Sequence, residues 1–314
     1  MTLYDNENIE SIEEIGLRES EHLSRKIKHG IKWQFITNLL GQAVYFGNGI
    51  ILARILSPKD FGIYGMSLVL SDFVFMFWNL GLNAAIIQRK EISKKHLDTA
   101  FTLYIIMGVA CFLITWIFAP LLAVFFKEPI VCSISRIIAL TFLIYALDRI
   151  PTALLTRGFN FKVITLTGLA NPVIYGLVSI TLAILGFGPV SFAWGVVLGT
   201  LGVSIGKIII GLRLYSWRPT IIVDKKCAKH LLGFGVFIML ADIANYFFGN
   251  LQKIITGKFF GAVELGYFTR SYNLSLMPLQ KVQANVSNVL LPAFSGIQDN
   301  KEKIRNWFRK FNFF

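Results

Sequence analysis

The sequence predicts an all-α integral membrane protein with about eight transmembrane helices. Its 314 residues are 54% hydrophobic and only 16% charged, and the mean hydropathy is +0.60. A soluble domain carries about a quarter charged residues. The apolar residues also form long blocks. A short motif that follows the first block occurs again before the last block. Together these three features predict the fold class.

Eight blocks are long and apolar enough to be spanning helices, each of which needs roughly 20 mostly apolar residues. The predicted spans are 31–53, 61–87, 99–124, 137–155, 163–186, 190–212, 232–256 and 267–291. Residues 1–24 are predicted to be an acidic cytoplasmic tail, because seven acids lie among the first 21 residues. A secretory signal begins basic and then turns apolar, so no signal peptide is predicted.

The positive charge of the chain indicates its orientation in the membrane. The net charge is +13, and with a cytoplasmic N-terminus the inner loops hold 21 of the 31 lysines and arginines, whereas the outer loops hold five. This asymmetry follows the positive-inside rule. Membrane lipids, rather than nucleic acid, are therefore the expected partners of the basic loops.

Residues with redox, metal-binding or nucleotide-binding chemistry are few. The cysteines Cys111, Cys132 and Cys227 have no regular spacing, and the four histidines form no metal-binding pattern with them. The chain also lacks the GxxxxGK loop that holds nucleotide phosphates. The sequence predicts no catalytic residue, no metal site and no cofactor.

A repeated phrase indicates an internal duplication. The stretch LSPKDFGIYG (56–65) follows the first predicted span, and FGAVELGYFT (260–269) follows the seventh. In the first copy, Ser57 can cap a helix, Pro58 suits the first helical position, and Asp60 can complete a capping box. The phrase therefore predicts a short outer turn followed by a new helix.

The second copy matches the first at a constant offset of 204 residues. Gly261 takes the cap position and Glu264 takes the place of the acid. The other matched pairs are Arg54 with Lys258, Gly62 with Gly266, Tyr64 with Phe268, and Ser67 with Ser271. Six spans separate the copies, so they share one orientation, which predicts a parallel repeat with its axis along the membrane normal.

The repeat predicts two lobes. A six-helix N-terminal lobe is expected over 25–230, and a partial C-terminal lobe with helices 7 and 8 over 231–314. A second lobe as long as the first would need more than twice the residues of 231–314. The sequence is therefore expected to stop four helices short of a complete second lobe.

Polar side chains inside the predicted spans recur every three or four residues, which places them on one face of each helix. They are Gln34, Asn38, Gln42, Tyr45 and Asn48 on helix 1; Asp72, Asn79 and Asn83 on helix 2; Asp242, Asn245, Tyr246, Gly249 and Lys253 on helix 7; and Arg270, Asn273, Lys281 and Asn288 on helix 8. A single amide is best explained as an interhelical hydrogen bond. Charges inside a span are costly without a partner or a wet cavity, so the four stripes together favour a wetted central cavity.

Fewer charges lie inside helices 3 to 6. Asp148 and Arg149 are expected to pair with each other or to meet the membrane interface. Arg136 and Lys207 are expected to snorkel toward the membrane surface.

Four segments resemble the Wzx-type polysaccharide exporters of the multidrug/oligosaccharidyl-lipid/polysaccharide flippase superfamily. They are ARILSPKDFGIYG (53–65), NAAIIQRKE (83–91), FFGAVELGYFTRSYNLSLMPLQ (259–280) and LLPAFSGIQ (290–298), within a likeness over nearly all of 25–314. The resemblance implies two six-helix lobes around a cavity lined by helices 1, 2, 7 and 8. Family members carry twelve or more helices, whereas eight are predicted here.

The resemblance also implies a function. Such a protein flips an undecaprenyl-pyrophosphate-linked oligosaccharide across the bacterial inner membrane, by alternating access, for exopolysaccharide, O-antigen or capsule synthesis. The N-terminus is expected in the cytoplasm. A glycan polymerase and the export machinery are the expected protein partners.

The polar stripes supply candidate contacts for this cargo. A pyrophosphate needs fixed cations, and the candidates are Lys253, Arg270 and Lys281, with Arg54 and Lys258 at the outer rim. The other candidates for the cavity, suited to glycan hydroxyls, are Gln34, Asn38, Gln42, Tyr45, Asn245, Tyr246 and Asn273. Asp72 and Asp242 are the candidates for binding a coupling cation or proton.

Three other functions remain open. A multidrug or metabolite exporter of the same superfamily would need a smaller and more apolar cavity, which several cations argue against. A membrane enzyme would need catalytic residues on a large outer loop or a His/Asp pair; the predicted outer loops are short and lack histidine, so no enzyme is predicted. The third is a non-transporting fragment or a partner subunit.

Overall fold

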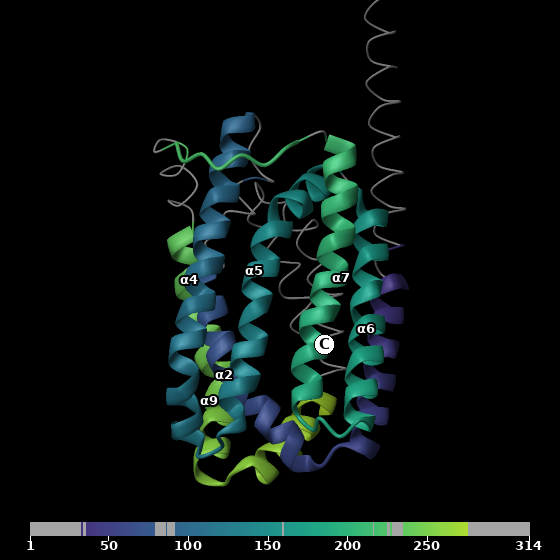
Figure 1. Cartoon of the computed structure of the whole chain (residues 1–314), viewed down its shortest axis with the longest axis vertical. Coiled ribbons are helices and arrows are strands. Elements are labelled where there is room, and N and C mark those ends of the chain that lie inside the picture. The colour runs from purple at the N-terminus through teal and green to yellow at the C-terminus, as the bar shows by residue number, and fades with distance from the viewer. Residues whose placement is uncertain are drawn as a thin grey trace, which may run out of the picture. The chain divides into compact units, whose positions relative to one another are not determined.

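The computed structural model describes residues 33, 36–78, 86, 92–158, 160–215, 217–224, 227 and 235–275. Within these residues the chain is helical and contains no strand (Figure 1). The helices are a first helix Ile36–Ile55, α2 (Pro58–Trp78), α4 (Lys94–Phe126), α5 (Ile130–Arg157), α6 (Phe161–Ile184), α7 (Val190–Tyr215), α9 (Gly235–Phe259) and a helix over 262–275.

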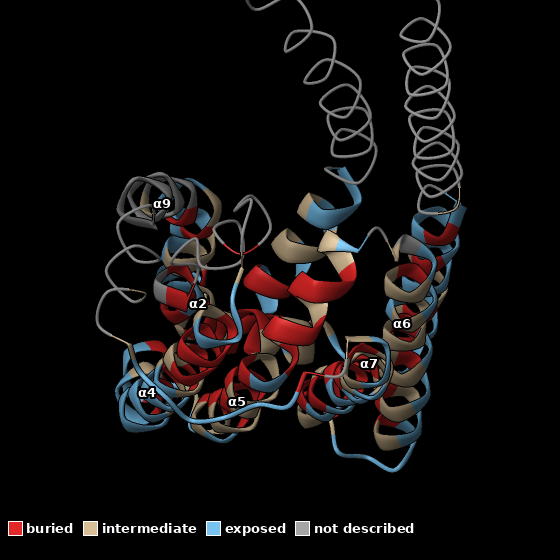
Figure 2. Ribbon diagram, turned by 90° about the horizontal axis from the view of Figure 1, so that it is seen from above, coloured by how far each residue is buried: buried red, intermediate tan, exposed pale blue. Residues whose placement is uncertain are grey.

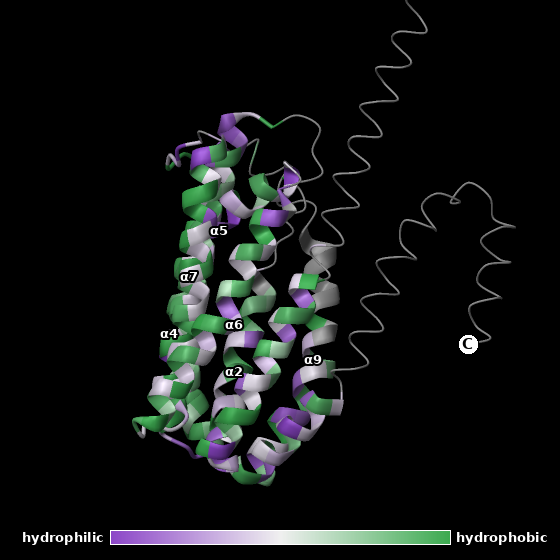
Figure 3. Cartoon of the chain, turned by 90° about the vertical axis from the view of Figure 1, so that its right-hand side faces the viewer, coloured by the Kyte–Doolittle hydropathy of each residue, from purple (hydrophilic) through white to green (hydrophobic). Residues whose placement is uncertain are grey.

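Five of the described helices are long and apolar enough to cross a membrane: the first helix, α4, α5, α6 and α7. They coincide with five of the eight predicted spans. The helix α2 overlaps the second predicted span over 61–78, and α9 overlaps the seventh over 235–256. At 1.5 Å per residue the two helices are about 31 and 37 Å long. Residues of high hydropathy follow the length of α4 and α7 (Figure 3). The protein is thus an all-α membrane protein, as predicted.

The described chain divides into two compact units at Gly266 and Tyr267. In the first unit α5 packs between α4 and α7, and α7 packs on α6. The helix α2 contacts α4, α5 and α9, so α9 belongs to this unit. The view from above shows α2, α4 and α9 on one side and α6 on the other (Figure 2). The predicted lobes over 25–230 and 231–314 stay a prediction.

An aromatic core holds α2, α4 and α5 together. Trp78 on α2 is buried, and its ring centroid lies 5.7 Å from that of Tyr104 and 6.3 Å from that of Phe142. A smaller apolar cluster joins the first helix to α6 and α7 and includes Leu52 and Phe192. These two clusters hold the first helix and α2, two of the helices with polar stripes, against their neighbours.

The predicted capping box at the start of α2 is confirmed. The Ser57 backbone N–H donates to Asp60 Oδ2 at 2.9 Å, and the Asp60 N–H donates to Ser57 Oγ at 3.3 Å. In the second copy Gly261 precedes the helix over 262–275 with φ of +94°. Its N–H donates to the carbonyl of Thr256 at the end of α9, so this turn is closed by the preceding helix.

The structure corrects the expected surroundings of Asp148, which is buried, and of Lys207, which is partly buried. Asp148 does not pair with its neighbour Arg149, because consecutive residues on a helix do not face each other. Its carboxylate lies 3.7 Å from Lys207 Nζ and accepts a 2.9 Å hydrogen bond from Ser204 Oγ. Lys207 therefore pairs across the α5–α7 contact instead of snorkelling, and Arg149 lies over the Tyr145 ring.

Candidate functional site

The two copies of the repeated phrase contact each other. A Cβ added to Gly62 would overlap the backbone carbonyl oxygen of Ala262, and a Cβ added to Gly266 would overlap that of Pro58. Gly62 and Gly266 are 204 residues apart, and so are Pro58 and Ala262. The contact is therefore reciprocal and relates the two helix starts by a local twofold axis.

This close approach explains why the phrase carries glycine at that position. Both glycines are buried, and the atoms against them belong to backbone. Any larger residue would push the two helices apart. The reciprocal contact brings the beginning of the helix over 262–275 against the beginning of α2.

A polar cluster lies farther along α2, where it packs on α9. The Lys253 Nζ lies 3.8 Å from Asp72 Oδ2 and donates to Asn250 Oδ1 at 3.0 Å. The Tyr246 hydroxyl donates to the carbonyl of Val69 at 3.1 Å, and its ring packs edge-on against Phe73. Three predicted site residues, Asp72, Tyr246 and Lys253, therefore meet at one helix contact.

The ion pair of this cluster lies about two thirds of the way along α2 and is partly exposed. Asp72 stands 14 residues after Pro58, or about 21 Å along the helix. The Asp72 side chain is 42% exposed and that of Lys253 is 19% exposed. Because the Asp72 carboxylate is partly accessible, another anion can take its place beside the Lys253 ammonium. The cluster can therefore bind an anionic group through the charge of Lys253.

The polar stripe of the first helix faces a different neighbour. The Asn48 side-chain amide donates to the carbonyl of Pro172 at 2.8 Å, and its side chain lies against Gly176 on α6. The Tyr45 hydroxyl hydrogen-bonds the side chain of Asn171. These contacts are interhelical hydrogen bonds, so Tyr45 and Asn48 act at least in part as packing residues between the first helix and α6.

The remaining predicted positions have several outcomes. Asn38 is exposed and Gln42 partly exposed on the first helix, and Arg54 is exposed near its end. The Lys258 ammonium donates to the carbonyl of Phe125 at 2.6 Å. Arg270 and Asn273 lie on the helix over 262–275 within the second unit. Outside the described residues or side chains lie Gln34, Asn79, Asn83, Asp242, Asn245, Lys281 and Asn288.

Sequence reasoning missed two site residues. Asn250, one turn earlier on α9, accepts a hydrogen bond from the Lys253 ammonium. Asn171 on α6 accepts a hydrogen bond from the Tyr45 hydroxyl. Asn250 could have been found, because it stands three residues before Lys253 and so on the same helix face. Asn171 belongs to no stripe, and only the packing of α6 on the first helix brings it to Tyr45.

Comparison with known proteins gives relatives with a common theme. A family model described as polysaccharide biosynthesis protein matches residues 51–313. An uncharacterized membrane protein in the cps region of Klebsiella pneumoniae is 28% identical over 302 residues, which cover 91% of this chain and 60% of the relative. No solved structure matches the chain.

Two further relatives have descriptive names. The lipopolysaccharide biosynthesis protein WzxC of Escherichia coli is 26% identical over 92% of this chain and 58% of its own length. The succinoglycan biosynthesis transport protein ExoT of Rhizobium meliloti is 23% identical over 89% of this chain and 56% of its own length. The chain thus spans about 60% of the length of these relatives.

Proposed function

Because this chain belongs to the polysaccharide biosynthesis protein family of Wzx-type transporters, we propose that it flips an undecaprenyl-pyrophosphate-linked oligosaccharide. The membrane crossed is the bacterial inner membrane, with the N-terminus of the chain in the cytoplasm. The product serves synthesis of exopolysaccharide, O-antigen or capsule. Two relatives carry names that refer to biosynthesis or transport of such polymers.

The observation that carries the proposal is the Asp72–Lys253 pair between α2 and α9. A pyrophosphate that crosses the bilayer needs a cation at membrane depth, since an unpaired charge there is costly. Lys253 is such a cation, and Asp72 holds it while no cargo is bound. The pyrophosphate then replaces Asp72 as the anionic partner of Lys253.

Other residues have roles in this proposal. Asp72, released from Lys253, binds the coupling cation or proton, and Asp242 is the second candidate for that role. Arg270 and Lys281 are further cations for the pyrophosphate, with Arg54 and Lys258 at the outer rim. The glycan contacts are assigned to Gln34, Asn38, Gln42, Tyr45, Asn245, Tyr246 and Asn273.

The basic residues at the ends of the described helices support the proposed orientation. Exposed lysines and arginines at the end of the bundle where α4 begins and α7 ends include Lys94, Lys95, Lys162 and Arg213. At the other end, Lys59 pairs with Glu128 at 3.0 Å. Under the positive-inside rule these residues support a cytoplasmic position for the start of α4.

The proposal is tested in the bacterium that encodes the chain. The gene is deleted and returned on a plasmid as wild type, Lys253→Met, Lys253→Arg or Arg270→Glu, with membrane abundance measured by immunoblot. We expect deletion to abolish surface polysaccharide and to accumulate lipid-linked oligosaccharide at the inner leaflet. Wild type restores export, whereas Lys253→Met and Arg270→Glu do not, at equal abundance.

The outcomes separate the competing functions. Normal surface polysaccharide in the deletion strain would contradict the proposal. Unchanged polysaccharide with raised sensitivity to toxic compounds would indicate the multidrug exporter. Restoration only when the rest of a twelve-helix protein is co-expressed would indicate that the chain is a partner subunit or a part of a longer transporter.

A further inference from the structure

The segment that leaves α7 is fastened to the beginning of α4. Residues 217–224 are not helical, and they cross the end of the bundle from α7 to α4 (Figures 1 and 2). The Trp217 indole N–H donates to Asp98 Oδ1 at 3.0 Å, and the Thr220 hydroxyl donates to Asp98 Oδ2 at 2.5 Å. Asp98 is 2% exposed, so one buried carboxylate holds two side chains of the segment.

Two threonines of α4 continue this attachment. The Ile222 N–H donates to Thr102 Oγ1 at 3.1 Å, and the Thr102 hydroxyl lies 3.1 Å from the Ile222 carbonyl oxygen. The Asp224 N–H donates to Thr99 Oγ1 at 3.2 Å. Trp217 also packs edge-on against Phe101 in the main core. The segment therefore has a fixed position over the first turns of α4.

The fixed segment turns apolar side chains outward. Ile221 is 79% exposed, and Ile222 and Val223 are each 50% exposed. Three consecutive β-branched apolar residues are not expected to stay in water when the surrounding structure holds them rigidly there. Something apolar is therefore expected to cover them.

The depth of the segment indicates what covers it. Thr102 and Asp98 stand 24 and 28 residues before Phe126, or about 36 and 42 Å along α4. The hydrocarbon core is about 30 Å thick, and the bilayer with its headgroups is about 40–45 Å thick. If the Phe126 end lies at the opposite edge of the hydrocarbon, residues 217–224 lie at the level of the headgroups.

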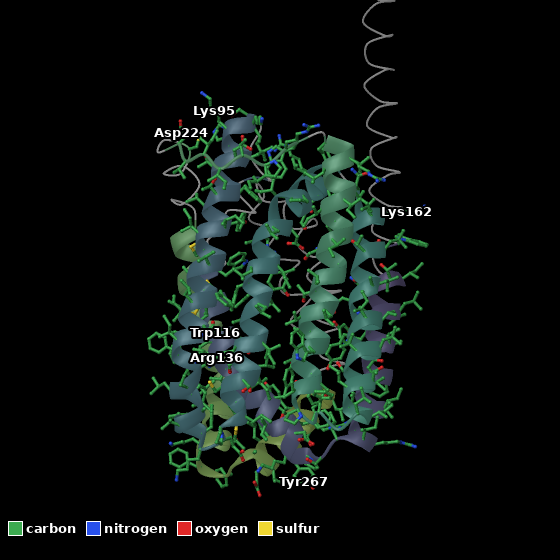
Figure 4. All side chains as sticks on the ribbon, viewed as in Figure 1. Lys95, Trp116, Arg136, Lys162, Asp224 and Tyr267 are labelled. Carbon is green, nitrogen blue, oxygen red and sulfur yellow. The ribbon has the colours of Figure 1, made fainter. Side chains whose placement is uncertain are left out.

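The charges around the segment favour anionic lipid. Lys94 and Lys95 at the start of α4, Arg213 at the end of α7, and Arg218 in the segment are all exposed. Lys95 and Asp224 lie near each other at this end of the bundle (Figure 4). The two acids described here are hydrogen-bonded: Asp98 is buried, and the Asp224 carboxylate accepts the backbone N–H of Cys227 at 3.0 Å. Exposed cations beside outward apolar residues suit an anionic membrane surface.

We propose that residues 217–224 form an interfacial strap. Hydrogen bonds to Asp98, Thr99 and Thr102 fasten it to α4, and Ile221, Ile222 and Val223 insert between the headgroups of anionic phospholipids. Arg218 and the lysines at the start of α4 bind the lipid phosphates. The strap is independent of the flippase proposal, because it concerns the bilayer around the protein and not the cargo.

The experiment measures the depth of Ile221 in a membrane. The full chain, with Cys111, Cys132 and Cys227 replaced by serine, receives Ile221→Cys and a nitroxide spin label. It is reconstituted in phosphatidylcholine vesicles with and without phosphatidylglycerol. Collision of the label with oxygen and with a water-soluble nickel complex is then compared. Ile117→Cys, at a 65% exposed position nine residues before the end of α4, is the lipid reference. Lys162→Cys is the polar reference at the end of the bundle that carries the strap.

We expect the label at 221 to lose collisions with nickel relative to position 162 and to gain collisions with oxygen. The effect should grow when phosphatidylglycerol is added. Nickel collisions equal to those at 162, or no response to phosphatidylglycerol, would overturn the proposal. A label shielded from both reagents would also overturn it, because a protein would then cover the strap.

A second variant tests the attachment. Asp98→Ala should release the strap, so the label at 221 becomes more mobile and returns toward water. If Asp98→Ala does not fold, Thr102→Val removes the paired hydrogen bonds of Ile222 while keeping the shape of the side chain. An unchanged label in a folded variant of either kind would contradict the attachment.

Discussion

Gly62 lies against the backbone carbonyl of Ala262, and its counterpart Gly266 makes the same contact with Pro58. The two helix starts that the repeated phrase marks therefore support each other through backbone atoms. The sequence shows the repeated phrase, and the structure shows that its two copies touch.

Substitution of either glycine is expected to destabilise the protein. Gly62→Ala or Gly266→Ala forces the helix starts apart, at a cost of about 1–3 kcal/mol for an overpacked site. The matched control is Gly168→Ala on α6, where a Cβ meets nothing within 4 Å and helix propensity favours alanine by about 1 kcal/mol. Thermal unfolding in detergent, followed by tryptophan fluorescence, checks both. Equal melting temperatures for the three variants would contradict the contact.

The Asp72–Lys253 pair is expected to matter for export more than for folding. The doubly exchanged variant Asp72→Lys/Lys253→Asp restores an ion pair, so it should melt within a few degrees of wild type. It should still fail to export, because the cation no longer stands at position 253. Melting curves and surface polysaccharide are measured on the same variants. Full export by the exchanged pair would mean that the two charges serve packing alone.

Asn48 and Gly176 should behave as one unit. Asn48→Ala removes the hydrogen bond to Pro172, which between membrane helices is worth about 0.6 kcal/mol on average. Gly176→Ala places a methyl group where the Asn48 side chain lies. The double variant should be less destabilised than the sum of the singles, because alanine at 48 makes room for alanine at 176. Strict additivity in a double-mutant cycle of unfolding would argue against this contact.

The Asp148–Lys207 pair is expected to be structural. Lys207→Met leaves the buried Asp148 carboxylate without its cation, and loss of one partner of a buried pair destabilises by about 3–5 kcal/mol. Lys162→Met, at an exposed position on α6, is the control and should be near neutral. Chemical denaturation in mixed micelles measures both changes. A Lys207→Met variant as stable as the control would show that Ser204 alone satisfies Asp148.

The local features of the fold were predictable from the sequence. Ser57 and Asp60 stand three residues apart, so the capping box that they form depends on one turn of chain. The spans follow from the length of the apolar runs, for example α4 and α7. The structure moves their ends, as at α5, which begins at Ile130 rather than 137, because Pro129 can start a helix in front of the apolar run.

The partners of polar residues were not predictable, because they depend on which helices pack together. Asp148 meets Lys207 only through the α5–α7 contact, and Asp98 meets Trp217 only because the segment after α7 crosses α4. The spacing of polar residues correctly predicted that Asp72 and Lys253 lie on inward faces of α2 and α9. It could not predict that their charged groups come within 3.8 Å of each other. Tyr45 and Asn48 belong to the polar stripe of the first helix, but the structure shows that this face packs on α6.

The atoms that confine Gly62 and Gly266 belong to the main chain. This determines which second substitutions could compensate for a larger residue at either glycine. No change of side chain at Pro58 or Ala262 removes a carbonyl oxygen. Second-site suppressors of a bulky residue 62 should therefore map to positions that alter how the two helices are angled, far from the lesion itself. A selection for such suppressors would reveal which parts of the protein set that angle.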